Sequence, residues 1–156
     1  MKKHLFLAGL ACAAAAPLAA ASAGEREVAR SVASFVEAVN TGHLKEALAH
    51  LTPDVAITED LAPYRWQGPK AGAQWLDAMW KNGQRMGVSN IRMRLEPPMQ
   101  VLVSGDRAYE AIPGVVTLAG KGPTLHERGL LTFALRRSGG VWKINQFSWG
   151  GEKAKP

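Results

Sequence analysis

The sequence predicts an α+β domain in which helices pack on one face of an antiparallel sheet. Apolar residues recur at helical spacing through three segments of the N-terminal half, and at alternating spacing through five segments of the C-terminal half. Short turns separate the alternating segments, so we expect successive strands to pair as hairpins. A chain of 156 residues, 47% of them hydrophobic, fits one domain and is too short for two ordinary ones.

Residues 1–23 are set apart from this domain and have the pattern of a bacterial secretory signal peptide. A basic start precedes a long apolar run, which ends at the small-x-small site Ala21-Ser22-Ala23. Pro17 interrupts the run and argues against a membrane-spanning anchor. We therefore expect cleavage after Ala23, a periplasmic or secreted location, and a single domain over residues 24–156.

The predicted mature chain contains no cysteine, because the single one, Cys12, lies in the leader. This excludes disulfides, thiol catalysis and thiolate metal ligands from the mature domain. Cys12 also lacks the large aliphatic residue that usually stands three places before a lipidated cysteine. Removing Lys2 and Lys3 leaves 17 basic against 13 acidic residues and lowers the net charge from +6 to +4. The basic residues are scattered, so we expect neither nucleic acid nor, after cleavage, a membrane as partner.

The N-terminal half predicts three helices and one short strand. The first helix covers residues 25–40, and the second covers residues 43–51 and ends at Thr52-Pro53-Asp54, because proline cannot continue it. Residues 55–58 are β-branched and short, which indicates a strand. Pro69 opens the third helix, whose broad apolar face ends near Asn82-Gly83 and must be buried.

The C-terminal half predicts a meander of strands. They are expected at residues 88–95, 101–104, 107–118, 125–137 and 141–149, separated by glycine- and proline-rich turns. A strongly curved sheet that closes over helices leaves a cavity, and such cavities are the usual ligand sites.

Two short motifs accompany this order of elements: Leu51-Thr52-Pro53-Asp54-Val55 before the first strand, and Gly140-Val141-Trp142-Lys143-Ile144 in the last. Together they resemble the nuclear transport factor 2-like superfamily, in particular its SnoaL-like and ketosteroid-isomerase-like branch, over residues 25–149. The resemblance implies a cone-shaped curved antiparallel sheet wrapped around the N-terminal helices, and a homodimer formed through the outer sheet face. Members include isomerases, cyclases, dehydratases and proteins without chemistry, so fold alone does not choose among them.

The resemblance also implies a proton-shuttling carboxylate near the end of the first strand, where this chain has Glu59-Asp60. Alternation places the two side chains on opposite faces, with Glu59 on the face of Val55 and Ile57. A one-residue insertion would favour Asp60 instead. A general base here needs a pKa raised by apolar surroundings; the alternative is a solvated strand end.

The proton donors of the family's isomerases are changed in this chain. The helix-one tyrosine corresponds to Phe35, and the later-strand aspartate falls near Gly129. Tyr109 or His126 could serve as a substitute donor, although such residues on strands are more often packed or at a rim.

Five tryptophans supply aromatic surface for a cavity. We expect Tyr64 and Trp66 at the cavity mouth and Trp75 and Met79 in one wall, although tryptophans often only fill a core. No cofactor is expected, since Gly120-Lys121-Gly122 has the composition of a hairpin turn. No metal is expected either, because His43, Glu46 and His50 fit an ordinary amphipathic helix.

Three functions remain open. The first is an exported domain that binds a small, largely apolar molecule in an aromatic cavity. The second is an isomerase, cyclase or dehydratase with Glu59 or Asp60 as general base and Tyr109 or His126 as partner. The third is a dimeric interaction module without chemistry. Its expected apolar patch on the outer sheet face consists of Phe133, Leu135 and Phe147.

Overall fold

The computed structural model describes residues 21–156 as three helices and one seven-stranded sheet. The predicted leader, apart from its last three residues, lies outside the described residues. The helices are α1 (Ala23–Asn40), α2 (Leu44–Ala49) and α3 (Ala71–Arg85). The strands are β1 (Leu51–Thr58), β2 (Arg65–Gln67), β3 (Val88–Leu95), β4 (Gln100–Ser104), β5 (Arg107–Gly120), β6 (Leu125–Ser138) and β7 (Val141–Gly151). The α+β prediction is confirmed.

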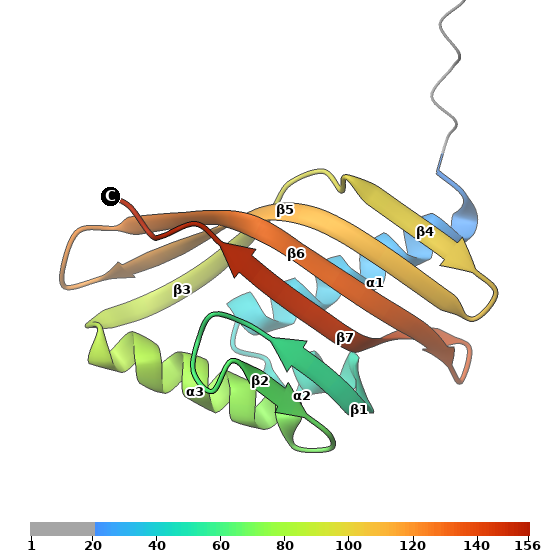
Figure 1. Cartoon of the computed structure of the whole chain (residues 1–156), viewed down its shortest axis with the longest axis horizontal. Coiled ribbons are helices and arrows are strands. Elements are labelled where there is room, and N and C mark those ends of the chain that lie inside the picture. The colour runs from blue at the N-terminus through green and yellow to red at the C-terminus, as the bar shows by residue number, and fades with distance from the viewer. Residues whose placement is uncertain (1–20) are drawn as a thin grey trace, which may run out of the picture.

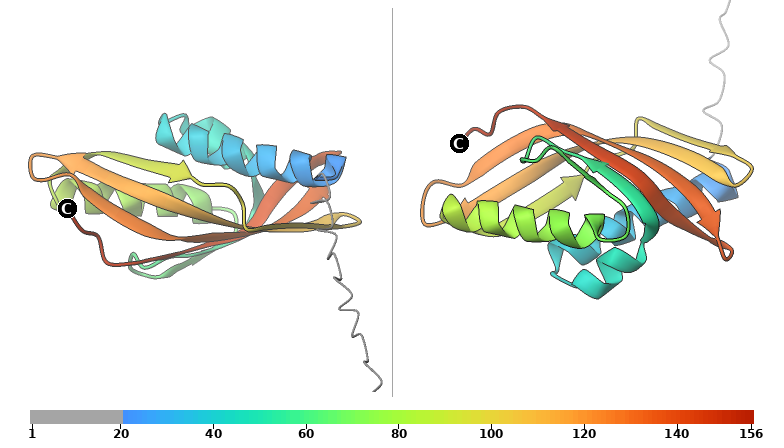
Figure 2. Two further views of the ribbon diagram at one scale, coloured as in Figure 1. Left: turned by 90° about the horizontal axis from the view of Figure 1, so that it is seen from above. Right: turned by 60° about the horizontal axis from the view of Figure 1, so that its bottom comes forward.

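The sheet is curved and not closed, with the strand order β2-β1-β7-β6-β5-β3. All neighbouring strands are antiparallel except β1 and β7, which run parallel. The expectation that successive strands pair as hairpins is wrong for β3 and β4, because β5 is long enough to pair with β4 through its first part and with β3 through its second. Figures 1 and 2 show the long strands passing over α1, with α3 beside β1 and β2.

α1 is fixed at both ends by side-chain hydrogen bonds. Ser22 and Glu25 form a capping box at its start, which satisfies backbone N–H groups that have no partner within the helix. At its end, the Asn40 amide bonds both the N–H and the carbonyl of Met93 in β3, each at 2.8 Å. These contacts hold the helix across the concave face of the sheet, called the inner face below. No helix within residues 21–156 is long and apolar enough to cross a bilayer.

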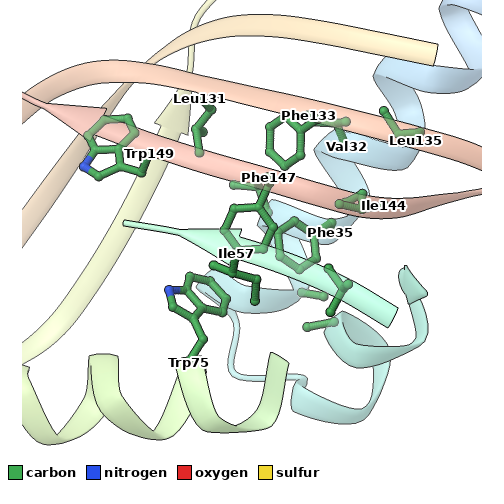
Figure 3. Packing of buried hydrophobic residues seen from close by; sticks show 14 of the residues in the cluster. Val32, Phe35, Ile57, Trp75, Leu131, Phe133, Leu135, Ile144, Phe147 and Trp149 are labelled. Carbon is green, nitrogen blue, oxygen red and sulfur yellow. The ribbon is translucent and has the colours of Figure 1, made fainter. Parts of the chain in front are cut away.

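The core lies between α1 and the inner face. Its centre is an aromatic cluster in which the ring of Phe147 lies 5.4 Å from that of Phe35 and 5.0 Å from that of Trp75 (Figure 3). Phe133 and Leu135 are 0% and 1% exposed. The predicted outer patch is therefore wrong, because the strand phase turns Phe133, Leu135 and Phe147 into the core.

The first half of the chain differs from the sequence prediction in several places, and α2 ends at Ala49 rather than at residue 51. β1 begins at Leu51, because a register shift against β7 between Leu51 and Ala56 accommodates Pro53, which has no N–H to donate. β2 was not predicted; its three residues pair with β1. α3 begins at Ala71, two residues after Pro69.

Candidate functional site

A cavity of about 490 Å³ lies between α1, α3 and the inner face. Most of its wall is apolar, and one part is acidic. The apolar lining includes Phe35, Val36, Val39, Trp75, Met79, Met86, Ile91, Met93, Val116, Leu118, Leu131, Phe133, Phe147 and Trp149. The acidic part, called the acid end below, consists of Glu59, Asp60 and Glu127.

Glu59 is placed at the acid end by the end of β1 and by α3. Val55 and Ile57 are buried on the inner face, and Glu59 follows them with the same alternation. The Trp75 indole Nε1 donates a hydrogen bond to Glu59 Oε2. Burial raises the pKa of Glu59 to about 7, the Trp75 bond opposes that rise, and the negative charges of Asp60 and Glu127 add to it.

Glu127 approaches the acid end from β6. The Trp149 indole Nε1, on the neighbouring β7, donates to Glu127 Oε1 at 2.8 Å. Burial raises the pKa of Glu127, the Trp149 bond opposes the rise, and the charge of Asp60 adds to it. Figure 3 shows the indole nitrogens of Trp75 and Trp149 pointing to the same side, away from the phenylalanine cluster. Two carboxyl groups are thus each held by one tryptophan.

Two glycines leave the space that this arrangement needs. Gly129 and Gly151 are register partners on β6 and β7. A Cβ atom at Gly129 would lie 2.5 Å from the Gly150 carbonyl oxygen and 2.6 Å from Trp149 Cη2, both closer than van der Waals contact allows. A Cβ atom at Gly151 would collide with the Glu127 carboxylate. The indole of Trp149 therefore lies across a strand position that has no side chain.

Three methionines, called the methionine wall below, line the apolar part of the cavity. Met79 and Met86 come from α3 and the residue that follows it, and Met93 comes from β3. Methionine side chains are flexible and polarisable, so they fit apolar ligands of irregular shape. The wall suits an apolar body rather than a strongly polar one.

The structure brings together four of the residues predicted for the site. Glu59, Asp60, Trp75 and Met79 all line the cavity. The expectation that Glu59 and Asp60 face opposite ways is wrong, because β1 ends at Thr58 and strand alternation no longer applies at Asp60.

The other four predicted residues lie elsewhere. Tyr64 is 61% exposed in a turn, and Trp66 is buried in the core from β2, so neither forms the cavity mouth. Tyr109 and His126 lie on the outer face, because their neighbours Ala108 and Glu127 point inward. They cannot act as partners of Glu59 within the cavity.

The sequence prediction missed Glu127, although strand phase contains the signal. Leu131 and Phe133 line the inner face of β6, and counting back by twos from them reaches Gly129 and Glu127. Phe35 also lines the cavity, and it has no hydroxyl group to donate. Within residues 21–156, no group of three or more His, Cys, Asp or Glu side chains is arranged to hold a metal ion.

The acid end can exchange protons with a bound molecule. A carboxyl group with a pKa near 7 is present in both protonation states at neutral pH, so it can accept or donate a proton. Apolar walls exclude water and strengthen electrostatic interactions inside the cavity.

Comparisons of structure reveal the same fold in other proteins. One is a candidate scytalone dehydratase from Novosphingobium aromaticivorans, with 13% identity and a TM-score of 0.71 over 85% of this chain and 86% of that chain. Another is hexachlorocyclohexane dehydrochlorinase LinA-type3 from Novosphingobium barchaimii, with 13% identity and a TM-score of 0.71 over 86% and 90% of the chains. A third is an NTF2-like protein of unknown function from Pseudomonas putida, with 19% identity and a TM-score of 0.62 over 82% and 86%.

At these identities the likeness is one of fold. No curated protein matches the sequence significantly. The family model of the SnoaL-like domain matches residues 20–148, which is most of the chain. This protein belongs to the SnoaL-like family.

Proposed function

We propose that the protein binds a small, largely apolar molecule in the cavity and that Glu59 exchanges a proton with it. One observation carries the proposal: the Glu59 carboxyl group stands at the end of an apolar cavity, fixed by the Trp75 indole, with its pKa raised to about 7. A general base needs this combination of fixed position and matched pKa.

The reaction class follows from these groups. Ionised Glu59 would take a proton from a carbon next to an electron-withdrawing group. Return of that proton to another carbon of the substrate gives an isomer, whereas departure of a leaving group from the adjacent carbon, with its bonding electron pair, gives an elimination product. Two proteins of similar fold are named for dehydration and dehydrochlorination, which supports eliminations as the first reactions to test.

The test separates binding from chemistry. Tryptophan fluorescence is titrated with neutral aromatic molecules, and those that saturate are screened for turnover. Glu59→Gln should keep binding and lower turnover by about 10²- to 10⁴-fold. Asp60→Asn, which removes a neighbouring charge from the same cavity, should retain most of the turnover. Unchanged turnover in Glu59→Gln would show that the base is wrong.

A carrier without chemistry is the second candidate. Phe35 and Gly129 stand at the positions that correspond to the proton donors of the family's isomerases. They provide neither a hydroxyl nor a carboxyl group, which favours a carrier. Native mass spectrometry of the protein purified gently from its own host distinguishes the two. A retained apolar molecule, released unchanged, supports the carrier; a product formed from an added precursor supports the enzyme.

Export and pairing are separate proposals. The protein would reach the periplasm or medium after losing residues 1–23, and intact-mass measurement of those fractions tests this. Two copies would pair through the outer sheet face, where Leu102, Tyr109 and Leu130 are 50%, 37% and 37% exposed. Sedimentation tests the pairing, because a monomer at high concentration contradicts it.

A further inference from the structure

We propose that the molecule bound in the cavity is an apolar amine, whose protonated nitrogen binds between Glu59 and Glu127 while its apolar body lies against the methionine wall. This inference rests on the proposed function, because it assigns a substrate class to the same cavity. The distribution of charge in and around the acid end supports it.

The carboxylates of the acid end have no basic partner. Within residues 21–156, no lysine, arginine or histidine nitrogen lies within 4.0 Å of a carboxylate oxygen of Glu59, Asp60 or Glu127. Arg85 is the only basic side chain that lines the cavity in this part of the chain. It lies ten residues beyond Trp75, about 15 Å along α3, and bonds Asn82 instead.

Seven of the ten other acids within residues 21–156 have a basic partner within 4.0 Å; Glu25, Glu37 and Glu110 do not. Asp54 pairs with Arg136 at 2.6 Å, and Asp77 pairs with Lys81 at 2.7 Å. The full chain has 19 lysines and arginines against 13 acids, so countercharges are plentiful. Their absence from the acid end leaves a negative region in a positively charged protein. A cationic group would be drawn to that region, and an anionic group would be repelled.

The hydrogen-bonding capacity of the acid end also fits an ammonium group. Glu59 Oε2 and Glu127 Oε1 each accept one indole N–H, and the second oxygen of each carboxylate receives no hydrogen bond from another described residue. The two carboxylates are near enough for the charge of Glu127 to act on Glu59. An alkylammonium group has three N–H donors and no acceptor, so its hydrogen-bonding groups match two free carboxylate oxygens. A carboxylate ligand has no hydrogen-bond donor for the free oxygens of Glu59 and Glu127. It could accept a hydrogen bond only from a glutamate that is itself protonated.

The cavity walls indicate the size and polarity of the rest of the ligand. A volume of about 490 Å³ is within the range of small-molecule sites and would hold an aryl or bicyclic body. Trp75 and Trp149, whose indoles bond Glu59 and Glu127, present aromatic surface beside the acid end, and an ammonium group near such rings gains cation–π attraction. One end of the ligand is therefore charged and the other end is apolar.

Binding of an ammonium group would also change the ionisation of Glu59. The bound positive charge stabilises the carboxylate form, so the pKa of Glu59 should fall from about 7 on binding. At pH 6.5, complex formation should therefore release a proton to the buffer. A neutral alcohol of the same shape should release none.

The experiment compares three molecules that share one body and differ in charge: 2-phenylethylamine, 2-phenylethanol and 3-phenylpropanoate. Each is titrated against the full protein at pH 8 and low salt, with tryptophan fluorescence as readout. We expect the amine to bind at least about tenfold more tightly than the alcohol, and the carboxylate to bind most weakly. Added salt should weaken the binding of the amine and leave the binding of the alcohol unchanged.

Two variants assign the preference to the acid end. Glu127→Gln should lower the affinity for the amine about tenfold and leave the affinity for the alcohol unchanged. Asp106→Asn, which removes an equal charge from the exposed turn between β4 and β5, should change neither. Calorimetry in buffers of different ionisation enthalpy measures the proton release.

The outcomes separate this inference from the proposed function. If the alcohol binds as tightly as the amine, or the carboxylate binds most tightly, the amine assignment is wrong while the cavity remains a binding site. If none of the three saturates at millimolar concentration, the cavity does not bind such molecules and both proposals are contradicted.

Discussion

Glu59 and Glu110 are two carboxyl groups with the same raised pKa in two different regions. Burial raises the pKa of each to about 7. Glu59 lines the cavity and accepts a hydrogen bond from Trp75. Glu110 lies on the inner face of β5 between Ala108 and Ile112, is 1% exposed, and has no hydrogen-bond partner for either oxygen among the described residues. It does not line the cavity.

The difference shows that a shifted pKa does not by itself mark a functional residue. At Glu59 the Trp75 N–H fixes the carboxyl group, and the open cavity leaves space for a molecule that could exchange a proton with it. At Glu110 the register neighbours are Val101 and Phe133, and a proton has no acceptor to reach. The first carboxyl group lines an open cavity, whereas the second only lowers stability once it is ionised.

The largest expected effect is on stability at Glu110. Its pKa is about 7 in the folded protein against 4.5 as the ordinary value, so the folded state binds its proton more tightly. The stability that Glu110 contributes by binding this proton is complete below pH 4.5 and is lost as the pH rises to 7. The loss in the free energy of unfolding is about 3 kcal/mol. Glu110→Leu should therefore raise the free energy of unfolding by about 3 kcal/mol at pH 8 and by much less at pH 4.5.

Urea denaturation at the two pH values measures this effect. Glu110→Gln is the matched variant, since it removes the charge but keeps a buried polar group without a partner, and it should recover only part of the gain. Equal stability differences for Glu110→Leu at both pH values would contradict the comparison, because the carboxyl group would then have the same pKa in the folded and unfolded states.

The next effect tests the cavity region alone. Gly129→Val should displace both the Trp149 indole and the Gly150 carbonyl, and destabilise the protein by about 2 kcal/mol through overpacking. The Trp149 bond to Glu127 should be lost, and the near-ultraviolet circular dichroism should change. Gly122→Val, in an open turn where a Cβ meets no atom within 4 Å, is the control. A Gly129 variant with native stability and spectrum would show that the indole has another place to lie.

A smaller effect concerns the hydrogen bond that distinguishes Glu59 from Glu110. Trp75→Phe keeps the aromatic ring but removes the N–H, so the pKa of Glu59 should rise by about one further unit. Carbon-13 NMR of the glutamate carboxyl groups follows the titration. Trp142→Phe is the matched control, because the Trp142 indole nitrogen has no partner among the described residues. A fall in the Glu59 pKa in the Trp75 variant would contradict the assigned role of the bond.

The smallest effect is expected on the outer face. Tyr109→Phe and His126→Gln should leave ligand affinity and turnover unchanged, because the sheet separates both side chains from the cavity. Activity lost in either variant, with native stability, would mean that the outer face takes part in the reaction.

Sequence patterns were sufficient for the fold and for the position of Glu59. Helical and alternating periods identified three helices and most strands, because each element buries one face against a single core. The phase of β1 also placed Glu59 correctly, since Val55 and Ile57 are unambiguous inner residues. Local spacing contains that information directly.

The rest of the site depends on phase across longer distances. The chemistry of Tyr109 and His126 makes them candidates in the sequence, but a one-residue difference in phase puts Ala108 and Glu127 inside instead. Trp66 is buried in the core because it lies on β2. That strand has three residues, which is too short for an alternating pattern to be recognised in the sequence. The pairing of Trp149 with Glu127 joins β7 to β6, so only the register of the folded sheet brings the two residues together.

Gly129 and Gly151 have a consequence for how mutations in this protein should be read. Both positions serve the acid end only by lacking a side chain. A library of variants scored by activity alone would rank them with Glu59 and Glu127, and would suggest more reactive groups than the cavity contains. A score that also reports the environment of Trp149 would separate loss of a chemical group from loss of the space in which that group is held.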